Sequence, residues 1–282
     1  MSSLLSIITP CFNSVDTIRE TMASVLSQTY RNYEYIIIDG GSTDGTLDII
    51  REYAPHFQGR MRWISEPDRG IYDAVQKGFA MSKGDVLAWI GSDDIYMPNA
   101  FAYVKMIFEE HPQVQWLTGE LCHIQEDGTF CNAEYTRNLK YRDFCLKKGF
   151  WVQQEATFWR RELWEKCSNA FGNYRYAGDY ALWLNFARNT QLYTLPLLLA
   201  AFRLRSGQAS QKHRREYMAE IDDICRKELA SMSYMQRLEL RIYSMLRGRR
   251  LLGRLARKME KHWDKGVKNF YFNHDTRTIE MM

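Results

Sequence analysis

Lys83-Gly-Asp-Val-Leu-Ala-Trp-Ile-Gly-Ser-Asp-Asp-Ile-Tyr-Met-Pro98 is the stretch that decides the fold. Its apolar run 85–90 has the length of a buried strand, which ends at Gly91 and is followed at once by two carboxylates. In open α/β sheets, ligands bind beyond the carboxyl ends of the strands. Adjacent carboxylates there suit a hard divalent cation such as Mg²⁺ or Mn²⁺. A turn with a helix N-cap before Pro98 is the competing interpretation.

Strands and helices alternate along the ninety residues around this stretch. Strands are predicted at 4–10, 35–39, 62–65 and 85–90, and helices at 15–28, 47–53 and 71–81. The second strand, Tyr35-Ile-Ile-Ile-Asp39, is apolar without alternation, as parallel central strands are. The pattern predicts a doubly wound, mostly parallel sheet.

Length and composition set further limits. A chain of 282 residues with 45% hydrophobic content can form one large α/β domain with an appendage. Its six cysteines are scattered without a Cys-x-x-Cys pair, which argues against a zinc site or a disulfide framework and favours a reducing cytoplasm. No basic leader precedes the first strand, and the longest later apolar run, 195–202, is far shorter than a membrane span. We therefore expect neither a signal peptide nor a membrane crossing.

Two common nucleotide-binding motifs are missing from the sequence. No Gly-x-Gly-x-x-Gly opens the first helix, and no Gly-x-x-x-x-Gly-Lys-Ser/Thr occurs in the chain. NAD-dependent enzymes and P-loop NTPases are therefore disfavoured.

Charge is distributed unevenly. From Arg203 onward, 19 Lys/Arg stand against 10 Asp/Glu, a net charge of +9, although the whole chain carries only +4. Within this tail, residues 236–263 place apolar side chains at helical spacing among arginines and lysines. Such helices suit an anionic membrane surface, with Trp263 as an interfacial anchor. A helix hairpin packed on the preceding domain is the alternative, and no nucleic acid is expected as a partner because no RNA- or DNA-reading motif accompanies the charge.

Five motifs occur in a fixed order along the chain. They are Ile8-Thr-Pro-Cys-Phe-Asn13, Ser24-Val-Leu-Ser-Gln28 with Glu34, Ile38-Asp-Gly-Gly-Ser-Thr-Asp-Gly-Thr46, Glu66-Pro-Asp-Arg-Gly-Ile-Tyr-Asp73, and Gly84-Asp85 leading into Ser92-Asp-Asp94. Together they closely resemble the inverting family 2 glycosyltransferases of GT-A fold, of the bacterial polysaccharide or O-antigen type. The resemblance implies an α/β, Rossmann-like, mostly parallel sheet flanked by helices. It also implies a catalytic domain at 1–205, with a nucleotide-sugar half at 1–98 and an acceptor half at 99–205, and a basic helical extension at 206–282.

The resemblance also assigns residues of the donor site. Strand ends hold the base and ribose of a UDP-sugar in that family, and the acidic motif holds the metal ion. The implied nucleotide contacts are Pro10, Phe12, Asn13, Asp39, Arg69, Ser92 and Asp93, and the implied metal ligands are Asp94, the most direct, and Asp93. For Asp39, capping of the following glycine turn is the alternative. Val75 and Gln76 stand where many members carry Arg and Asn, with Asp73 and Lys77 nearby as candidate substitutes.

The second half of the chain is expected to bind the acceptor. Helix 101–110 and strands 115–118 and 121–125 are predicted first, and the segment 150–159 is predicted as an aromatic strand. Its Trp151 and Trp159 suit either stacking on sugar rings or core packing, and its Gln153, Gln154 and Glu155 suit sugar hydroxyls.

Asp179 is the candidate general base. It falls in the first turn of a helix opening near 176–183, where the helix dipole favours an ionised carboxylate. Related enzymes carry the catalytic Asp of an acidic pair at this position, although Gly178 here replaces the first acid. A plain N-cap is the alternative.

The segment 202–213 resembles the one that closes over the donor diphosphate in this family. Arg203, Arg205, Lys212 and His213 are candidates to neutralise phosphate. For His213, a further metal ligand or a surface histidine are alternatives.

These patterns lead to one functional hypothesis. It is a metal-dependent, inverting transfer of a hexose or N-acetylhexosamine from a UDP-sugar to a hydroxyl of a glycan, carried by a polyprenyl diphosphate, with a beta linkage as product. The protein would be cytoplasmic, either free or peripheral on the inner face of the membrane. A nucleotidyl- or phosphosugar transferase, and a non-catalytic basic membrane-associated scaffold, are the alternatives.

Overall fold

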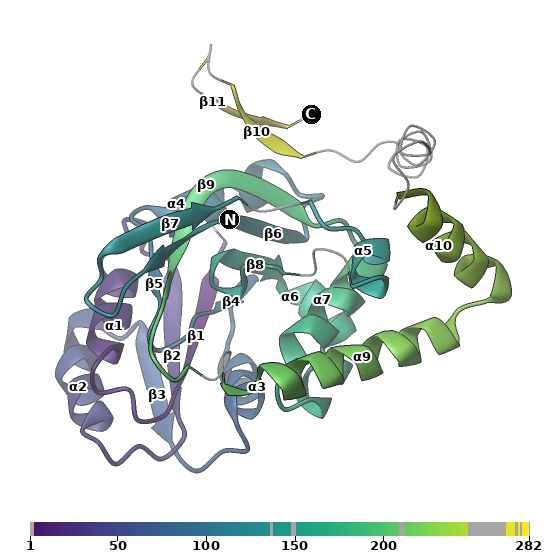
Figure 1. The fold of residues 1–282 in the computed structure, drawn as a ribbon. Coiled ribbons are helices and arrows are strands. Elements are labelled where there is room, and N and C mark those ends of the chain that lie inside the picture. Colours follow the sequence, from purple (N-terminus) through teal and green to yellow (C-terminus); the bar gives the residue numbers. More distant parts are fainter. Residues whose placement is uncertain are drawn as a thin grey trace.

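The first half of the chain forms a four-stranded parallel layer (Figure 1). The structure is a computed structural model and describes residues 3–135, 138–147, 151–208, 212–247, 269–273, 276 and 278–281. Strands β1 (Leu5–Cys11), β2 (Tyr33–Asp39), β3 (Met61–Ser65) and β4 (Val86–Trp89) pair in parallel in the order β3-β2-β1-β4. The connecting helices are α1 (Ile18–Leu26), α2 (Thr46–Tyr53) and α3 (Ile71–Met81), with a short 3₁₀ turn, η1 (Ala54–Phe57), before β3. This arrangement confirms the predicted doubly wound half.

Each strand buries side chains on both faces. Ile7 and Ile37 pack in a cluster with α1, α2 and α4 (Ala100–Glu110), whereas Ile8 and Ile38 pack in a second cluster with α3, α6 (Arg161–Cys167) and α7 (Gly178–Asn189). Successive side chains of a strand point to opposite faces, so a strand covered on both sides is apolar throughout. The unbroken apolar runs in the sequence follow from this burial.

The part of the chain from residue 95 to residue 203 extends the same sheet in mixed orientation. The added strands are β5 (Ile95–Tyr96), β6 (Trp116–Ile124), β7 (Phe130–Glu134), β8 (Thr157–Arg160) and β9 (Tyr193–Arg203). The order continues β4-β8-β6-β9-β5, with β7 paired on β6; β8 is antiparallel to both β4 and β6, and β9 is parallel to β6. The remaining short elements are α5 (Tyr141–Cys145), η2 (Gln154–Ala156) and η3 (Ser168–Asn173).

Two segments of this part of the chain differ from the sequence-based expectation, and one apolar run without an assigned element is a strand. The two strands predicted at 115–118 and 121–125 form one strand, β6, whose pairing with β9 is irregular around Gly119. A Cβ at Gly119 would lie 2.3 Å from the Leu199 side chain, so only glycine fits this close approach. The apolar run at 195–202 is part of β9, and the predicted strand at 150–159 is a strand only from Thr157 onward.

The C-terminal extension begins with two helices, as expected. Helix α9 (Arg214–Ser231) passes α7, and α10 (Tyr234–Arg247) follows after a turn of the chain (Figure 1). Tyr243 of α10 is buried, with the Arg142 guanidinium 4.9 Å from its ring centroid. The end of the chain is not helical, because β10 (Phe270–Asn273) and β11 (Thr278–Met281) form an antiparallel hairpin. Phe270 is buried in the core cluster of α4 and β9, which anchors this hairpin to the sheet.

Within the described part of the chain, no helix combines the length and apolarity needed to cross a bilayer. Most of the segment 236–263, including Trp263, lies outside the described residues.

Candidate active site

The candidate donor site lies where three parallel strands end. Strand β1 pairs with β2 on one side and β4 on the other, so the strand order reverses at β1. A crevice forms beyond the strand ends at such a switch point. The residues after β1, the end of β2 and the turn after β4 therefore meet at one edge of the sheet.

Asp39, the last residue of β2, is fully buried and holds the glycine turn that follows it. Its carboxylate accepts hydrogen bonds from the backbone N–H groups of Gly41 and Ser42, at 3.0 and 2.9 Å, and from the hydroxyls of Ser42 and Ser65. Burial alone would raise the pKa of this carboxyl, but these hydrogen bonds outweigh burial and lower it. Asp39 therefore stays ionised and shapes the turn.

The residues after β1 present one large exposed ring. Phe12 is 62% exposed and lies beside Gly40, where an added Cβ would meet the Phe12 ring at 3.4 Å and an Asp68 carboxylate oxygen at 2.7 Å. Asn13 has a φ of 48°, and its side-chain oxygen accepts a hydrogen bond from Thr43 N–H at 3.0 Å. The Phe12 ring, Gly40 and Asp68 thus face one another, which suits a flat base. Pro10 is buried inside β1.

Arg69 lies on the loop before α3. Its side chain is 87% exposed, and its guanidinium binds the Asp73 carboxylate at 2.7 Å. Lys77 lies 3.5 Å from the same carboxylate and 2.8 Å from Glu66. Arg69 is therefore a surface cation held by an i,i+4 ion pair at the rim of this edge.

The turn after β4 brings the two motif carboxylates to one point. A Cβ placed on Gly91 would lie 2.7 Å from Asp94 Oδ2 and 3.0 Å from Asp93 Oδ1, so both oxygens face the space above this glycine. Asp94 Oδ1 accepts a hydrogen bond from Arg203 N–H at 2.9 Å, and the Ser92 hydroxyl lies 2.7 Å from the Ser14 hydroxyl. Only a glycine at this position allows the carboxylates to converge.

Arg203 stabilises this turn and is not available to bind phosphate. Its guanidinium, 1% exposed, donates to the backbone oxygens of Asp93 and Glu126 at 2.9 and 2.8 Å and pairs with Glu20. The sequence-based expectation of a phosphate-neutralising Arg203 is therefore wrong, because these protein acceptors occupy its donors in the interior. Sequence alone could not distinguish a buried arginine from one at the surface.

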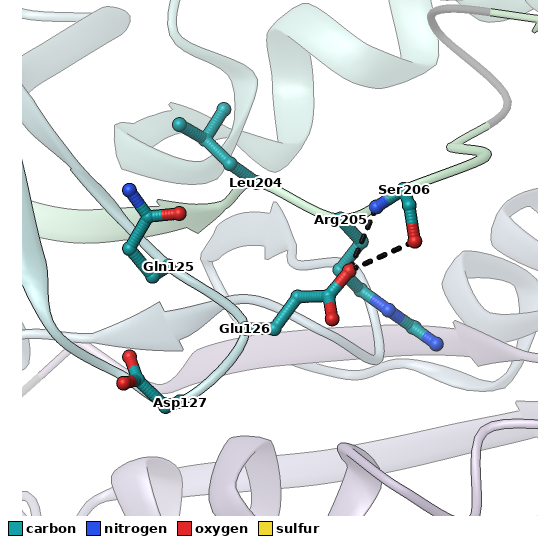
Figure 2. A pocket seen from close by; sticks show the side chains of 6 residues that line it. All are labelled: Gln125, Glu126, Asp127, Leu204, Arg205 and Ser206. Carbon is teal, nitrogen blue, oxygen red and sulfur yellow. Dashed lines mark hydrogen bonds between the residues drawn. The ribbon is translucent and has the colours of Figure 1, made fainter.

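Arg205, two residues further on, lies at the surface beside the acidic turn. Its Nη1 atom is 3.7 Å from Asp93 Oδ2, and its side chain is 32% exposed. Figure 2 shows the adjoining pocket of about 560 Å³, where Ser206 donates two hydrogen bonds to Glu126. The lining residues are Gln125, Glu126, Asp127, Leu204, Arg205 and Ser206. Arg205 is thus the cation of segment 202–213 that lies beside the motif carboxylates.

Lys212 and His213 precede α9. Lys212 is exposed, and the His213 ring stacks on Tyr176 with 4.8 Å between ring centroids. His213 Nδ1 lies 4.0 Å from Glu216 Oε1. The structure therefore places His213 against an aromatic ring at the start of the helix.

Asp179 lies in the first turn of α7 and is held by two tyrosine hydroxyls. The Tyr72 hydroxyl donates to Asp179 Oδ1 at 3.0 Å, and the Tyr217 hydroxyl lies 3.5 Å from Oδ2. Burial raises the pKa of Asp179, hydrogen bonds from Tyr180 N–H and from both hydroxyls lower it, and the net result is a pKa of about 6. A carboxylate with this pKa is mostly ionised at pH 7 and basic enough to take a proton from a hydroxyl.

Close packing explains why the residue before Asp179 is a glycine. A Cβ on Gly178 would lie 2.6 Å from the Phe171 carbonyl oxygen and 2.8 Å from the Tyr72 ring. The first acid of the acidic pair in related enzymes therefore cannot be accommodated here. The Tyr72 ring fills this space, and its hydroxyl supplies a hydrogen bond to Asp179.

Glu155 connects the two acidic sites electrostatically and was not among the predicted catalytic or metal-binding residues. It lies in η2, directly before β8, the strand that is antiparallel to β4. Burial, together with the nearby charges of Asp179 and Asp93, raises its pKa to about 7. The only feature of the sequence that pointed to Glu155 was the polar Gln-Gln-Glu interruption in an aromatic segment.

The acidic turn fits a divalent cation by its donor chemistry. Burial, together with the neighbouring charges of Asp93 and Glu155, raises the pKa of Asp94 well above its ordinary range. A bound cation would compensate this concentrated negative charge, and carboxylate oxygens are ligands that Mg²⁺ and Mn²⁺ prefer. Among the described residues, no group of three or more His, Cys, Asp or Glu side chains is positioned to hold a metal ion. Asp93 and Asp94 would therefore share the ion with ligands from outside the protein, such as phosphate oxygens.

The two tryptophans of segment 150–159 have different environments. Trp159 is fully buried and lies 5.3 Å from the Trp89 ring, in a cluster that also contains Trp116 and Trp183. Trp151 is 57% exposed, and its ring meets Tyr217 edge-on at 5.6 Å. Core packing is therefore confirmed for Trp159, whereas Trp151 lies at the surface beside the tyrosine that contacts Asp179.

The mixed sheet superposes on solved structures of other proteins. S. aureus TarS 1–349, solved in complex with UDP-GlcNAc, superposes with a TM-score of 0.67 at 15% identity, covering 84% of this chain and 70% of that one. The mannosyltransferase PcManGT from Pyrobaculum calidifontis, solved with GDP-Man and Mn²⁺, gives a TM-score of 0.54 at 17% identity over 93% of this chain and 87% of that one. The chain has the GT-A fold.

The sequence itself places the chain in a family. The model described as Glycosyl transferase family 2 matches residues 6–169, so the protein belongs to glycosyl transferase family 2 and is a glycosyltransferase. A PGL/p-HBAD biosynthesis glycosyltransferase of Mycobacterium tuberculosis is 26% identical over 77% of this chain and 84% of its own length. An uncharacterized glycosyltransferase of Rickettsia typhi is 35% identical over 74% of this chain and 66% of its own length.

Proposed function

We propose that this glycosyltransferase transfers a hexose or N-acetylhexosamine from a UDP-sugar to a glycan hydroxyl with inversion at C1. The observation that carries the proposal is the half-buried Asp179 carboxylate, which is hydrogen-bonded by Tyr72 and Tyr217 and interacts electrostatically with Glu155, itself influenced by Asp93 of the acidic turn. A base and a separate acidic turn are what a single displacement requires, because one acts on the acceptor and the other lies at the leaving group.

Each group has one task in this mechanism. Asp179 takes the proton of the acceptor hydroxyl as the hydroxyl oxygen attacks C1 of the donor sugar, and the bond from C1 to the diphosphate oxygen breaks. The exposed Phe12 ring would stack on the uracil base beside Gly40, while Asp39 keeps the glycine turn in place. An alpha-linked donor then gives a beta-linked product and UDP.

The leaving diphosphate would be neutralised at the turn after β4. Asp94 and Asp93 would hold Mn²⁺ or Mg²⁺, which supplies electrostatic stabilisation of the charge that develops on the diphosphate. Arg205, 3.7 Å from Asp93, would contribute a second positive charge. Arg203 acts indirectly, because it holds the Asp93 and Asp94 backbone in place.

For the acceptor, we propose a lipid-linked surface glycan such as an O-antigen or polysaccharide intermediate on a polyprenyl diphosphate. The relatives named for PGL/p-HBAD biosynthesis and the net charge of +9 after residue 202 support this choice. Such an acceptor would be reached from the inner face of the cytoplasmic membrane by a peripherally bound enzyme.

The test is UDP release from a panel of UDP-sugars with Mn²⁺, with Mg²⁺ and with EDTA. We expect metal-dependent release from one UDP-sugar, and a loss of at least about 100-fold in Asp94→Asn and in Asp179→Asn with acceptor present. Asp48→Asn, which changes an 80% exposed carboxylate on α2, is the matched control and should retain full activity.

Three outcomes would contradict the proposal. Release of pyrophosphate instead of UDP would indicate nucleotidyl transfer, and an alpha-linked product by NMR would exclude inversion. Vesicle binding that persists in the Asp94 and Asp179 variants, combined with no turnover of any nucleotide-sugar by the native protein, would favour a non-catalytic scaffold.

A further inference from the structure

An exposed aromatic surface lies beside the proposed base. The Trp151 side chain is 57% exposed, its ring centroid is 5.6 Å from that of Tyr217, and the Tyr217 hydroxyl is 3.5 Å from Asp179 Oδ2. The three side chains are therefore in contact in sequence, from the exposed Trp151 indole through the Tyr217 ring to the half-buried Asp179 carboxylate. We call Trp151 and Tyr217 the aromatic platform.

The exposure of Trp151 contrasts with the burial of four core tryptophans. Trp89, Trp116, Trp159 and Trp183 are each less than 2% exposed and contact one another in the core. Leaving a large apolar ring in water is unfavourable, and such rings often mark a ligand surface. The platform thus has the character of a binding site.

The platform joins two distant parts of the chain. Trp151 comes from the loop before η2, whereas Tyr217 comes from the first turns of α9 in the C-terminal extension. Glu220, one turn after Tyr217, accepts hydrogen bonds from the N–H groups of Arg175, Tyr176 and Ala177 at 3.1, 2.8 and 2.8 Å. Because residues 175–177 lead directly into Asp179, α9 fixes the platform and the base relative to each other.

The nucleotide is expected elsewhere. Phe12, Gly40 and Asp68 form a separate surface at the ends of β1 and β2. Asp179 and Tyr217 belong to helices of the second half, so the platform lies on the side of the molecule that supplies the base. Its ligand is therefore the second substrate.

We propose that the aromatic platform is a subsite for a pyranose ring of the acceptor. This inference rests on the proposed function, because it takes Asp179 as the base. The apolar C–H face of the sugar would stack on the Trp151 indole, and one hydroxyl would point to Asp179. The ligand class is therefore a sugar with one apolar face and an edge that carries hydroxyls. A purely aliphatic alcohol would not suffice, because the base at the inner end of the platform needs a hydroxyl held in a fixed orientation.

Binding is tested with saturation-transfer NMR on the full-length protein. The probes are methyl α- and β-pyranosides of glucose, galactose and mannose, together with cyclohexanol as an apolar alcohol and UDP as a reporter of the donor site. We expect at least one pyranoside to receive saturation on one face of its ring, and this signal to fall about tenfold in Trp151→Ala and less in Trp151→Phe. UDP binding should be unchanged in both variants.

The matched control is Tyr234→Ala, which removes a 69% exposed aromatic ring from the start of α10. Its pyranoside signal should equal that of the native protein. Equal pyranoside signals in Trp151→Ala and the native protein, or cyclohexanol binding as well as any sugar, would overturn the subsite. An absence of UDP binding in the native protein would instead reject the proposed donor, so the two failures are distinguishable.

Kinetics separate a subsite from a structural role. Once a turning-over donor and acceptor pair is known, Trp151→Ala should raise KM for the acceptor about tenfold while donor hydrolysis in the absence of acceptor stays at the native rate. Loss of both activities together would mean that Trp151 supports the fold of the site, and would overturn the subsite.

Discussion

Asp179 owes its chemical character to two opposing effects on one carboxyl group. Burial raises its pKa, the hydroxyls of Tyr72 and Tyr217 and the N–H of Tyr180 lower it, and the net value is about 6. An isolated aspartate at a helix N-terminus would titrate near pH 4 or below. Asp179 is therefore a stronger base than an isolated aspartate at a helix N-terminus, but it becomes protonated, and so inactive as a base, in mild acid.

The pH profile of Tyr72→Phe tests this balance. A base acts only when deprotonated, so kcat/KM of the native enzyme should fall as the pH drops through about 6. Removing the Tyr72 hydroxyl removes a hydrogen bond to the ionised form, so the pKa of Asp179 should rise and the acid limb should move up by roughly one pH unit. Tyr103→Phe, at an exposed position on α4, is the control and should leave the profile unchanged.

The neighbour of Asp179 must be considered in the same experiment. Glu155 has a pKa of about 7, raised by burial and by its electrostatic interaction with Asp179 and Asp93, so two groups titrate close together. Glu155 still holds its proton over most of the range in which Asp179 titrates, so Glu155→Gln should leave the acid limb near its native position, unlike Tyr72→Phe. An acid limb that moves in Glu155→Gln and stays in place in Tyr72→Phe would show that Asp179 does not control the limb.

Residue types next to strand ends were predictable, but their surroundings were not. The carboxylates at 93, 94 and 179 follow from local patterns, because a strand end and a helix start can be recognised from neighbours in sequence. The interior position of Arg203 depends on contacts with Glu20 and Glu126, which lie far away in the sequence. Tyr217 likewise reaches Asp179 only because α9 packs beside α7.

At the level of elements, the parallel half followed from the sequence and much of the second half did not. Strands β1, β2 and β4 are buried on both faces and read as apolar runs between clear breaks. In contrast, β9 contains Pro196, and β6 contains Gly119, two residues that ordinarily argue against a strand interior. Their pairing register shifts between Thr118 and Leu121, which accommodates both residues.

We expect helix α9 to support catalysis by holding residues 175–177, which lead into Asp179. Glu220→Gln leaves one acceptor oxygen for three backbone N–H groups, so residues 175–177 should loosen. We expect faster amide hydrogen exchange at these residues, a loss of about 1–2 kcal/mol in the free energy of unfolding, and a lower kcat. Glu216→Gln, one turn earlier and 51% exposed, should change none of these three quantities. Unchanged exchange at 175–177 in Glu220→Gln would show that α9 does not hold this segment.

Over the whole molecule, charge and exposed apolar groups gather at the same end of the chain. Residues 203–282 carry a net charge of +9, and α10 exposes Met235, Ile242 and Met245 alongside Arg237 and Arg241. Met235, Ile242 and Met245 lie seven and three residues apart, so they form one stripe along the helix. An apolar stripe flanked by arginines is the pattern of a helix that lies in the interface of an anionic bilayer.

Vesicle co-sedimentation tests whether this end binds membrane or merely packs on the catalytic domain. Native protein should bind vesicles containing about 30% phosphatidylserine, with binding that weakens as NaCl rises, because each arginine near an anionic surface contributes about 1 kcal/mol. Arg237→Gln with Arg241→Gln should therefore weaken binding roughly thirtyfold, and Met235→Ser with Ile242→Ser should weaken it even in low salt.

The control must change the same charge elsewhere. Arg51→Gln with Lys105→Gln removes two positive charges from α2 and α4 and should leave binding close to native. Equal losses in the two charge variants would mean that total charge, and not α10, attracts the vesicles. If the native protein does not bind vesicles at low salt, the alternative interpretation is favoured, in which the C-terminal helices pack on the catalytic domain. In that case an acceptor on a membrane would have to come to the enzyme by another route, and the aromatic platform would be the first place to look for its sugar.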